Sequence, residues 1–223
     1  MHSEAIYNEF KAKVFNLNSS AGSGISDSSF VRLFNEQLRK WVQNTQAEQG
    51  NNYRIENLDP LLITGELLTV ARNFNHLTSY RLPEKFFLRV NVQAEATKEG
   101  GTSYLYVQMP KPKDFDGFFH NDFYKPSYEF EHTLGRIAGK HLVIYKSNDF
   151  ELRNVYFSYY RLPEYIDLAG YIKEDGSVSV YAETDLPDYI IDQVIDMAVL
   201  EYFMRANNTE AAKMAAERIS FSK

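Results

Sequence analysis

An alternation of apolar and polar residues over positions 86–97 constrains the fold of this chain more than any other feature. The segment FFLRVNVQAEAT places leucine and valine at every second position, between arginine, asparagine and glutamine. A two-residue period is typical of a strand in an antiparallel sheet with one buried and one wet face. A second strand pattern, TSYLYVQMP at 102–110, follows the turn sequence KEGG. The two segments therefore predict a hairpin that turns near Gly100-Gly101.

Further strand patterns follow along the chain. Residues 129–137 and 140–147 predict a second hairpin around Ala138-Gly139, and LRNVYFSYY at 152–160 predicts another strand. A turn at 174–177 precedes VSVYA, for which we expect a short strand. The 16 tyrosines and 16 phenylalanines favour β structure over a plain helical bundle.

Two helices are predicted before the strands. Apolar residues at helical spacing over 3–17 indicate a short amphipathic helix, and NSSAGSG at 18–24 is typical of a flexible joint. A second amphipathic helix is expected to run to about Glu48, with Ser26 or Asp27 capping its first turn.

A third helix is predicted over 188–205, opened by the sequence Asp185-Leu186-Pro187. We expect Asp185 to cap it and Pro187 to occupy its first turn, where a missing amide costs nothing. Its apolar arc is wider than a one-sided surface helix needs, so the helix is either central to its own domain or shared with a partner. The tail after Asn207-Asn208 is either a second, alanine-rich helix or a frayed end.

These patterns together predict an α+β fold with an antiparallel, sandwich-like sheet in the middle, N-terminal helices and a C-terminal helix. We divide the chain into a helical region at 1–50, a β-rich region at 51–187, and a helix and tail at 188–223, as one compact domain with helical flanks. Residues 55–73 fit either a helical turn or an extended loop. Residues 111–127, rich in aromatics and proline, predict a long ordered loop.

The pentapeptide Tyr-Arg-Leu-Pro-Glu occurs twice, at 80–84 and at 160–164. A true duplication would extend the match into the flanking residues, which differ. We favour the interpretation that each Leu-Pro marks a turn at the edge of a sheet, because proline lacks the amide that a central strand needs.

Composition argues against several classes of protein. The formal net charge is −6, which disfavours sequence-independent binding to nucleic acid. The absence of cysteine excludes disulfides, thiolate metal sites and a cysteine nucleophile, and it is consistent with a reducing cytoplasm. No apolar run has the length of a signal peptide or of a membrane span, so we expect a soluble protein that does not contact the membrane.

No catalytic motif stands out. A metal cluster could be formed by His120, Asp122, Glu129, Glu131 and His132, but their spacing matches no standard ligand motif, and polar residues of a loop and strand are the favoured interpretation. Gly22-Ser23-Gly24 lacks the Gly-Lys continuation of a phosphate loop, and no Gly-x-Ser-x-Gly elbow occurs. The acid pairs at 114/116 and 188/192 are typical of solvated surfaces. We therefore expect neither an enzyme nor a bound cofactor.

Aromatic and apolar surfaces are the remaining candidates for function. The predicted subunit or partner contacts lie in the loop at 111–127 and in the helix at 188–205. They are Phe118, Phe119, Phe123, Tyr124, Ile190, Ile191, Val194, Met197, Tyr202 and Phe203.

Several stretches resemble the ring or neck proteins of tailed phages. They are SDSSFVRLFNEQLRKWVQ at 26–43, SYRLPEKFFLRV at 79–90, the segment 125–168 and TDLPDYIIDQVIDMAVLEYF at 184–203. The most specific part is the Pro-Ser-aromatic-Glu segment at 126–129, which leads into the Tyr-Tyr-Arg-x-Pro strand and the Leu-Pro helix. The resemblance is greatest to structural proteins of crAss-like phages of Bacteroides-type bacteria.

The resemblance implies a non-enzymatic virion protein, made in the host cytoplasm, that forms a ring in the neck. Such rings are commonly dodecamers beneath the portal, contact adjoining neck or tail proteins, and let DNA pass without sequence-specific binding. The alternative class is a stand-alone binding or assembly-chaperone module of a phage, followed by an enzyme with an unrecognised site.

Overall fold

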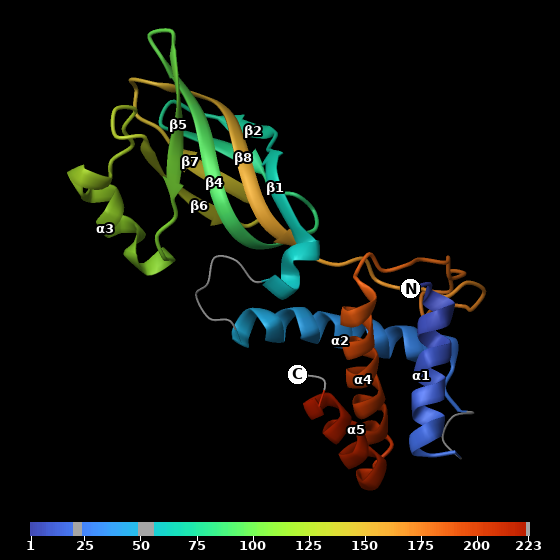
Figure 1. Ribbon diagram of the computed structural model, residues 1–223. Helices are drawn as coiled ribbons and strands as arrows, with labels where there is room; N and C mark the ends of the chain where they lie inside the picture. Colours follow the sequence, from blue (N-terminus) through green and yellow to red (C-terminus); the bar gives the residue numbers. More distant parts are fainter. Residues whose placement is uncertain (20–23, 49–55, 222–223) are drawn as a thin grey trace. The chain divides into compact units, whose positions relative to one another are not determined.

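A computed structural model describes residues 1–19, 24–48 and 56–221 (Figure 1). The chain forms two compact units. Unit 1 combines Met1–Pro60 with Pro163–Lys223, and unit 2 is the continuous segment Leu61–Leu162. The long helices belong to unit 1 and the sheet to unit 2, which confirms the predicted α+β fold.

Unit 2 contains one eight-stranded sheet, counted over the described residues, in the order β1-β8-β4-β5-β6-β7-β3-β2. Neighbouring strands are antiparallel except β5 and β6, which are parallel and joined by the long segment that carries a short helix. The strands are β1 (Leu62–Leu67), β2 (Val70–Asn73), β3 (Leu77–Arg81), β4 (Phe86–Lys98), β5 (Gly101–Gln108), β6 (His132–Ala138), β7 (His141–Tyr145) and β8 (Glu151–Arg161).

The two outermost strands, β1 and β2, are consecutive in the chain and are separated only by Leu68 and Thr69. The Leu68 amide donates to the Val155 carbonyl of β8 at 2.9 Å, and the Arg81 amide of β3 donates to the Thr69 carbonyl at 2.9 Å. One bent segment thus forms both outermost strands, one paired with β8 and the other with β3, and the sheet curls around its core. Residues 55–73, for which the sequence left two options, form a 3₁₀ turn (Glu56–Leu61) and these two strands in their described part.

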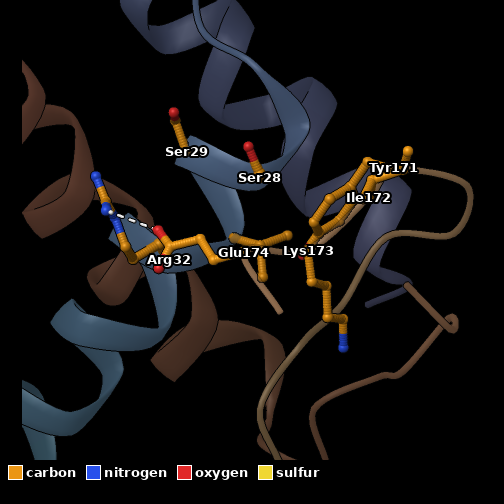
Figure 2. Close-up of a pocket in the computed structure, with 8 residues that line it drawn as sticks. Ser28, Ser29, Arg32, Tyr171, Ile172, Lys173 and Glu174 are labelled. Atoms are coloured by element: carbon orange, nitrogen blue, oxygen red, sulfur yellow. Dashed lines mark hydrogen bonds and ion pairs between the residues drawn. The ribbon is translucent and has the colours of Figure 1, made fainter. Parts of the chain in front are cut away.

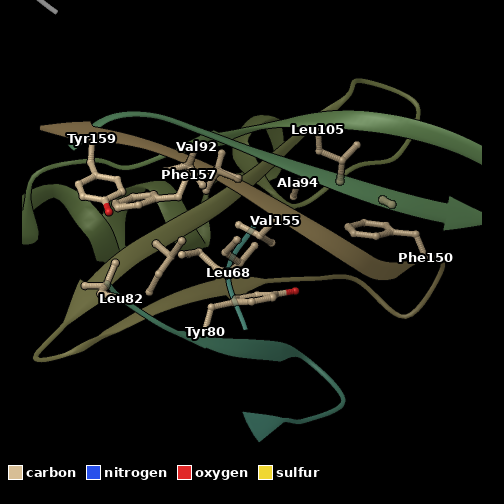
Figure 3. Packing of buried hydrophobic residues seen from close by; sticks show 14 residues of the cluster. Leu68, Tyr80, Leu82, Val92, Ala94, Leu105, Phe150, Val155, Phe157 and Tyr159 are labelled. Carbon is tan, nitrogen blue, oxygen red and sulfur yellow. The ribbon is translucent and has the colours of Figure 1, made fainter. Parts of the chain in front are cut away.

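The core of unit 2 lies inside the curl (Figure 3). Leu68 packs there with Tyr80 of β3 and Val155 of β8, and all three side chains are less than a tenth exposed. The aromatic contacts include Phe86 with Phe157, whose ring centroids are 5.3 Å apart. Because each Å² of buried apolar surface contributes about 25 cal/mol, this enclosed cluster stabilises unit 2.

The predicted hairpins are confirmed. β4 and β5 pair from Gln93 with Tyr106 to Lys98 with Gly101, and β6 and β7 pair around Ala138 with His141. Gly100 and Gly139 have φ of 84° and 59°, a left-handed conformation that glycine adopts at little cost.

The two Tyr-Arg-Leu-Pro-Glu copies each span the end of a strand. β3 ends at Arg81 and β8 ends at Arg161, and each strand is second from an end of the sheet order. The tyrosines that begin the two copies, Tyr80 and Tyr160, are almost fully buried. The prolines therefore lie just beyond the strands, as their missing amide requires.

Unit 1 is helical. Its helices are α1 (Ser3–Leu17), α2 (Asp27–Glu48), α4 (Asp188–Arg205) and α5 (Thr209–Phe221). The predicted cap of α2 is confirmed, because Ser26 Oγ accepts from the Ser29 amide at 3.3 Å. The cap predicted for α4 is wrong: Pro187 is its N-cap, without a side-chain hydrogen bond, and the Asp185 carboxylate accepts from the Glu164 amide instead.

Helix α4 lies at the centre of unit 1, in contact with α1, α2 and α5. Phe10 of α1 contacts both Phe30 of α2 and Tyr202 of α4, with ring centroids 5.1 and 6.0 Å apart. Polar contacts fix the same helices, including Lys13 with Asp196 at 2.8 Å. The sequence left open whether this helix is central to its own domain or shared with a partner. In the structure α4 is central to unit 1.

The segment 163–187 belongs to unit 1, whereas the sequence division placed it in the β-rich region. Asn35 of α2 holds it with two hydrogen bonds to Ile166, one to the carbonyl at 2.9 Å and one from the amide at 3.0 Å. The short strand expected at VSVYA is absent from the described sheet, and Ile172 with Val178 forms only an isolated bridge. The hydrogen bonds between Asn35 and Ile166 leave no hydrophobic pattern in the sequence, so the sequence could not predict them.

The predicted loop at 111–127 is also more structured than expected. It contains helix α3 (Phe115–His120) between two 3₁₀ turns, Pro112–Asp114 and Asp122–Tyr124. The Asn121 side chain accepts from the Phe123 amide at 3.0 Å and so starts the second turn.

Gly135 of β6 provides a test of the tight packing in unit 2. A Cβ added there would lie 2.6 Å from Val107 Cγ1 and 3.3 Å from the Val143 carbonyl oxygen. We expect Gly135→Ala to lower the free energy of unfolding by about 1–3 kcal/mol, because the core must shift to admit the methyl group. Hydrogen exchange of the β6 and β7 amides over a urea series would measure it. Gly117→Ala, in open space, is the matched control and should leave these amides unchanged.

Candidate interaction surfaces

One exposed apolar surface lies on unit 1, in the segment 169–182, which we call the valine loop. A bridge between Asp167 and Ala182 closes its base, and the Lys173 amide donates to the Ser177 carbonyl at 2.8 Å across its turn. The turn is further fixed by the Asp175 carboxylate, which accepts from the Ser177 amide at 2.9 Å. These bonds give the loop a defined conformation without a sheet.

The valine loop directs its apolar side chains outward. Ile172, Val178 and Val180 are 73%, 66% and 74% exposed. The residue between the two valines, Ser179, is 4% exposed, and its Oγ accepts from the Tyr171 amide at 3.0 Å. A free surface rarely gathers several large apolar side chains in one place, whereas contact surfaces do.

A hollow of about 510 Å³ lies between α2 and the valine loop (Figure 2). Ser28, Ser29 and Arg32 line it from α2, and residues 171–174 line it from the loop. Arg32 and Glu174 approach to 3.4 Å, but both are strongly exposed, so their pairing contributes little. Both serines hydrogen-bond to Ser26 Oγ at the start of α2, which gives them a part in the helix cap.

Asp167 anchors the base of the valine loop. Its carboxylate accepts from the Tyr171 hydroxyl at 2.7 Å and the Leu168 amide at 3.0 Å, and it pairs with Lys173 at 2.7 Å. Burial opposes ionisation of Asp167, but the bonds from Lys173 and Tyr171 outweigh it and lower the pKa of the carboxyl group. Burial and the bond to Asp167 raise the pKa of Tyr171 to about 12.

The predicted contact residues of α4 are mostly internal. Ile190, Ile191, Val194 and Phe203 are fully buried in unit 1, so a partner cannot touch them while the unit is folded. Met197 and Tyr202 are partly exposed. Met197 lines a groove of about 740 Å³ with residues of α2, α4 and α5 that include Trp41, Tyr189, Leu200 and Ile219.

The predicted contact residues of the loop at 111–127 lie in unit 2. Phe115 packs on Tyr145 of β7 with ring centroids 5.3 Å apart and so attaches α3 to the sheet. Phe118 and Tyr124 contact each other at 4.4 Å, and Phe123 is 88% exposed. Phe119 is not among the residues whose side chains the structure describes. The loop therefore holds two of its rings together and presents a third to solvent.

The described residues contain no group of three or more histidine or acidic side chains that could hold a metal ion. Of the metal candidates named from the sequence, His120 and Asp122 have side chains outside the described set. Two others have partners of a different kind: Glu129 pairs with Lys98, and Glu131 accepts from Ser103 Oγ at 2.8 Å.

None of the helices in the described ranges is long and apolar enough to cross a membrane.

No protein-family model matches this sequence, and a search of curated proteins finds no significant match.

The valine loop was not among the contact surfaces predicted from the sequence. The sequence signal was present, since VSVYA alternates as a half-buried strand does. A period of two identifies one apolar face but not whether that face points inward. Here Ser179 finds its partner inside the unit, and the valines lie on the opposite side.

The Asp167 network yields a stability prediction. Asp167→Asn should lower the free energy of unfolding of unit 1 by about 1–2 kcal/mol, because the bonds from Tyr171 and the Leu168 amide are then made to a neutral oxygen and the ion pair with Lys173 is lost. The fluorescence of Trp41, the single tryptophan, reports unfolding of this unit. Glu174→Gln, at a side chain 92% exposed, is the control and should have little effect.

The same comparison predicts a pH dependence. Because the pKa of Asp167 is lowered by folding, its stabilisation is complete above the ordinary value of 3.8 and is lost as the pH falls through the lowered value. The difference between wild type and Asp167→Asn should therefore persist at neutral pH and shrink below pH 3.8. A difference that does not change in acid would contradict this assignment.

Proposed function

We propose that this chain is a virion structural protein that forms an oligomeric ring in a phage neck. In this role it connects the portal to the tail and lines the channel for DNA, with twelve subunits as the resemblance implies. The sequence resemblance supports the class of protein. The exposed valine loop is the structural observation that carries the proposal, because it offers apolar surface that a neighbouring subunit would cover.

A closed cyclic ring needs two different, complementary patches on each subunit. The valine loop of unit 1 supplies one candidate. The aromatic turn after α3 in unit 2 supplies the other, through Phe123 and the Phe118–Tyr124 pair beside it. Aromatic residues are enriched in the buried centres of interfaces, so this turn fits the same role.

The buried residues of α4 support assembly indirectly. Ile190, Ile191, Val194 and Phe203 hold α4 in the core of unit 1, and the valine loop belongs to the same unit. The acidic balance of the chain also suits a channel protein, since a negative surface does not retain DNA.

Mass photometry of the purified protein, alone and with portal protein added, tests the proposal. We expect one large closed oligomer whose mass is a fixed multiple of 25.9 kDa. A persistent monomer under both conditions would contradict ring formation and favour a binding or chaperone module. Quantitative mass spectrometry of purified virions is the second test, and its expected result is a fixed ratio to portal protein.

Charge substitutions test the two patches. Val180→Asp and Phe123→Asp should each raise the concentration at which the ring half-dissociates by about tenfold or more, because a charge enters a desolvated contact. Neither should change the melting temperature of the monomer, since both side chains are exposed.

Phe15→Asp is the matched control, because Phe15 of α1 is 56% exposed and outside both patches. Rings that resist Val180→Asp and Phe123→Asp, or that respond equally to Phe15→Asp, would show that other surfaces join the subunits.

A further inference from the structure

A positively charged pocket lies in unit 2, separate from the valine loop and from Phe123. It has a volume of about 470 Å³ and is formed by β4, β6, helix α3 and the segment that follows β5. Among the residues that the structure describes, its lining contains three cations, Arg89, Lys111 and Arg136, and no acidic residue. In a chain with a formal net charge of −6, such a concentration of positive charge requires an explanation.

The three cations have no carboxylate partner among the described residues, where Lys98, Lys146 and Lys173 do have one. The adjacent acids of the chain, Asp114 and Asp116, do not line the pocket. Like charges placed together repel one another, and a bound anion relieves that repulsion.

Two aromatic rings orient the Arg136 guanidinium. Its guanidinium lies 5.3 Å from the ring centre of Phe115 and 5.9 Å from that of Tyr145. Stacking on aromatic rings orients the planar guanidinium without occupying its in-plane N–H donors. A guanidinium so placed can donate two parallel hydrogen bonds to a carboxylate or a phosphate.

The other described residues of the lining are apolar, and this composition favours one of these anions over the other. Met109, Pro110, Phe115, Ile137 and Ala138 share the pocket with the cations. Single-stranded nucleic acid needs a groove of cations that follows its phosphates, whereas here three cations gather in one hollow of an acidic chain. A carboxylate that is followed by an apolar side chain satisfies both parts of the lining.

We propose that this pocket binds an acidic segment of a partner protein, with a glutamate or aspartate carboxylate on Arg136 and an adjacent apolar side chain against Met109 and Ile137. Arg89 and Lys111 line the same pocket and add charge attraction. The site goes beyond ring formation, because neither the valine loop nor Phe123 lines it.

Fluorescence anisotropy with a labelled hexapeptide of alternating glutamate and leucine tests the proposal. Its matched probe replaces each glutamate by glutamine. We expect binding of the glutamate peptide that weakens as salt increases, and at least about tenfold weaker binding of the glutamine peptide, since charged contacts are screened and lost.

Variants locate the site. Arg136→Gln should weaken binding of the glutamate peptide about tenfold, and Arg136→Lys should restore only part of it, because lysine retains the charge without the planar fork. Arg153→Gln removes an exposed arginine of β8 outside the pocket and should leave binding unchanged. Thermal melting of each variant checks that α3 and the sheet remain folded.

Four results would overturn the proposal. They are absence of peptide binding, equal binding of the two peptides, an equal loss in Arg153→Gln, and tighter binding of a labelled single-stranded DNA 12-mer than of the glutamate peptide. The last result would assign the pocket to nucleic acid.

Discussion

The fold of unit 2 depends on two backbone hydrogen bonds at Leu68 and Thr69. They join a single bent segment to β8 on one side and to β3 on the other. The two strands at the ends of the sheet order, β1 and β2, are therefore consecutive in the chain. An open sheet would leave the Tyr80 and Val155 side chains in water, whereas the curled sheet encloses them.

The curl also determines where chemistry can occur in unit 2. With the interior filled by apolar side chains, charged and aromatic groups are left to the outer face and to the connection between β5 and β6. Phe115 attaches that connection to Tyr145, and the same contact orients Arg136. One aromatic cluster thus supports both the exposed Phe123 turn and the positive pocket.

Unit 1 separates apolar residues that stabilise it from apolar residues that remain available. Helix α4 has a wide apolar surface, and packing against α1 and α2 buries most of it, as Ile191 and Phe203 show. The valine loop, with the same type of side chains, keeps them in solvent because Ser179 and Asp167 supply its internal bonds. In the role that we propose, α4 provides the rigid support and the loop provides the contact.

Local patterns were sufficient for most elements. Period-two alternation predicted the β4–β5 hairpin, helical spacing predicted α1 and α2, and Ser26 was one of two residues predicted to cap α2. Each of these features depends on neighbours within a few residues. The α5 helix was one of two options for the tail, and the α3 helix was not predicted.

Tertiary structure decided the features that depend on contacts distant in sequence. Residues 163–187 join the helices because Asn35 bonds to Ile166, and Arg89 meets Arg136 because β4 and β6 flank the same strand. Whether a patterned residue faces the core or solvent was likewise undetermined for Val178 and for Ile190. Periodicity gives the direction of side chains relative to one another, and only the packed neighbours give their direction relative to water.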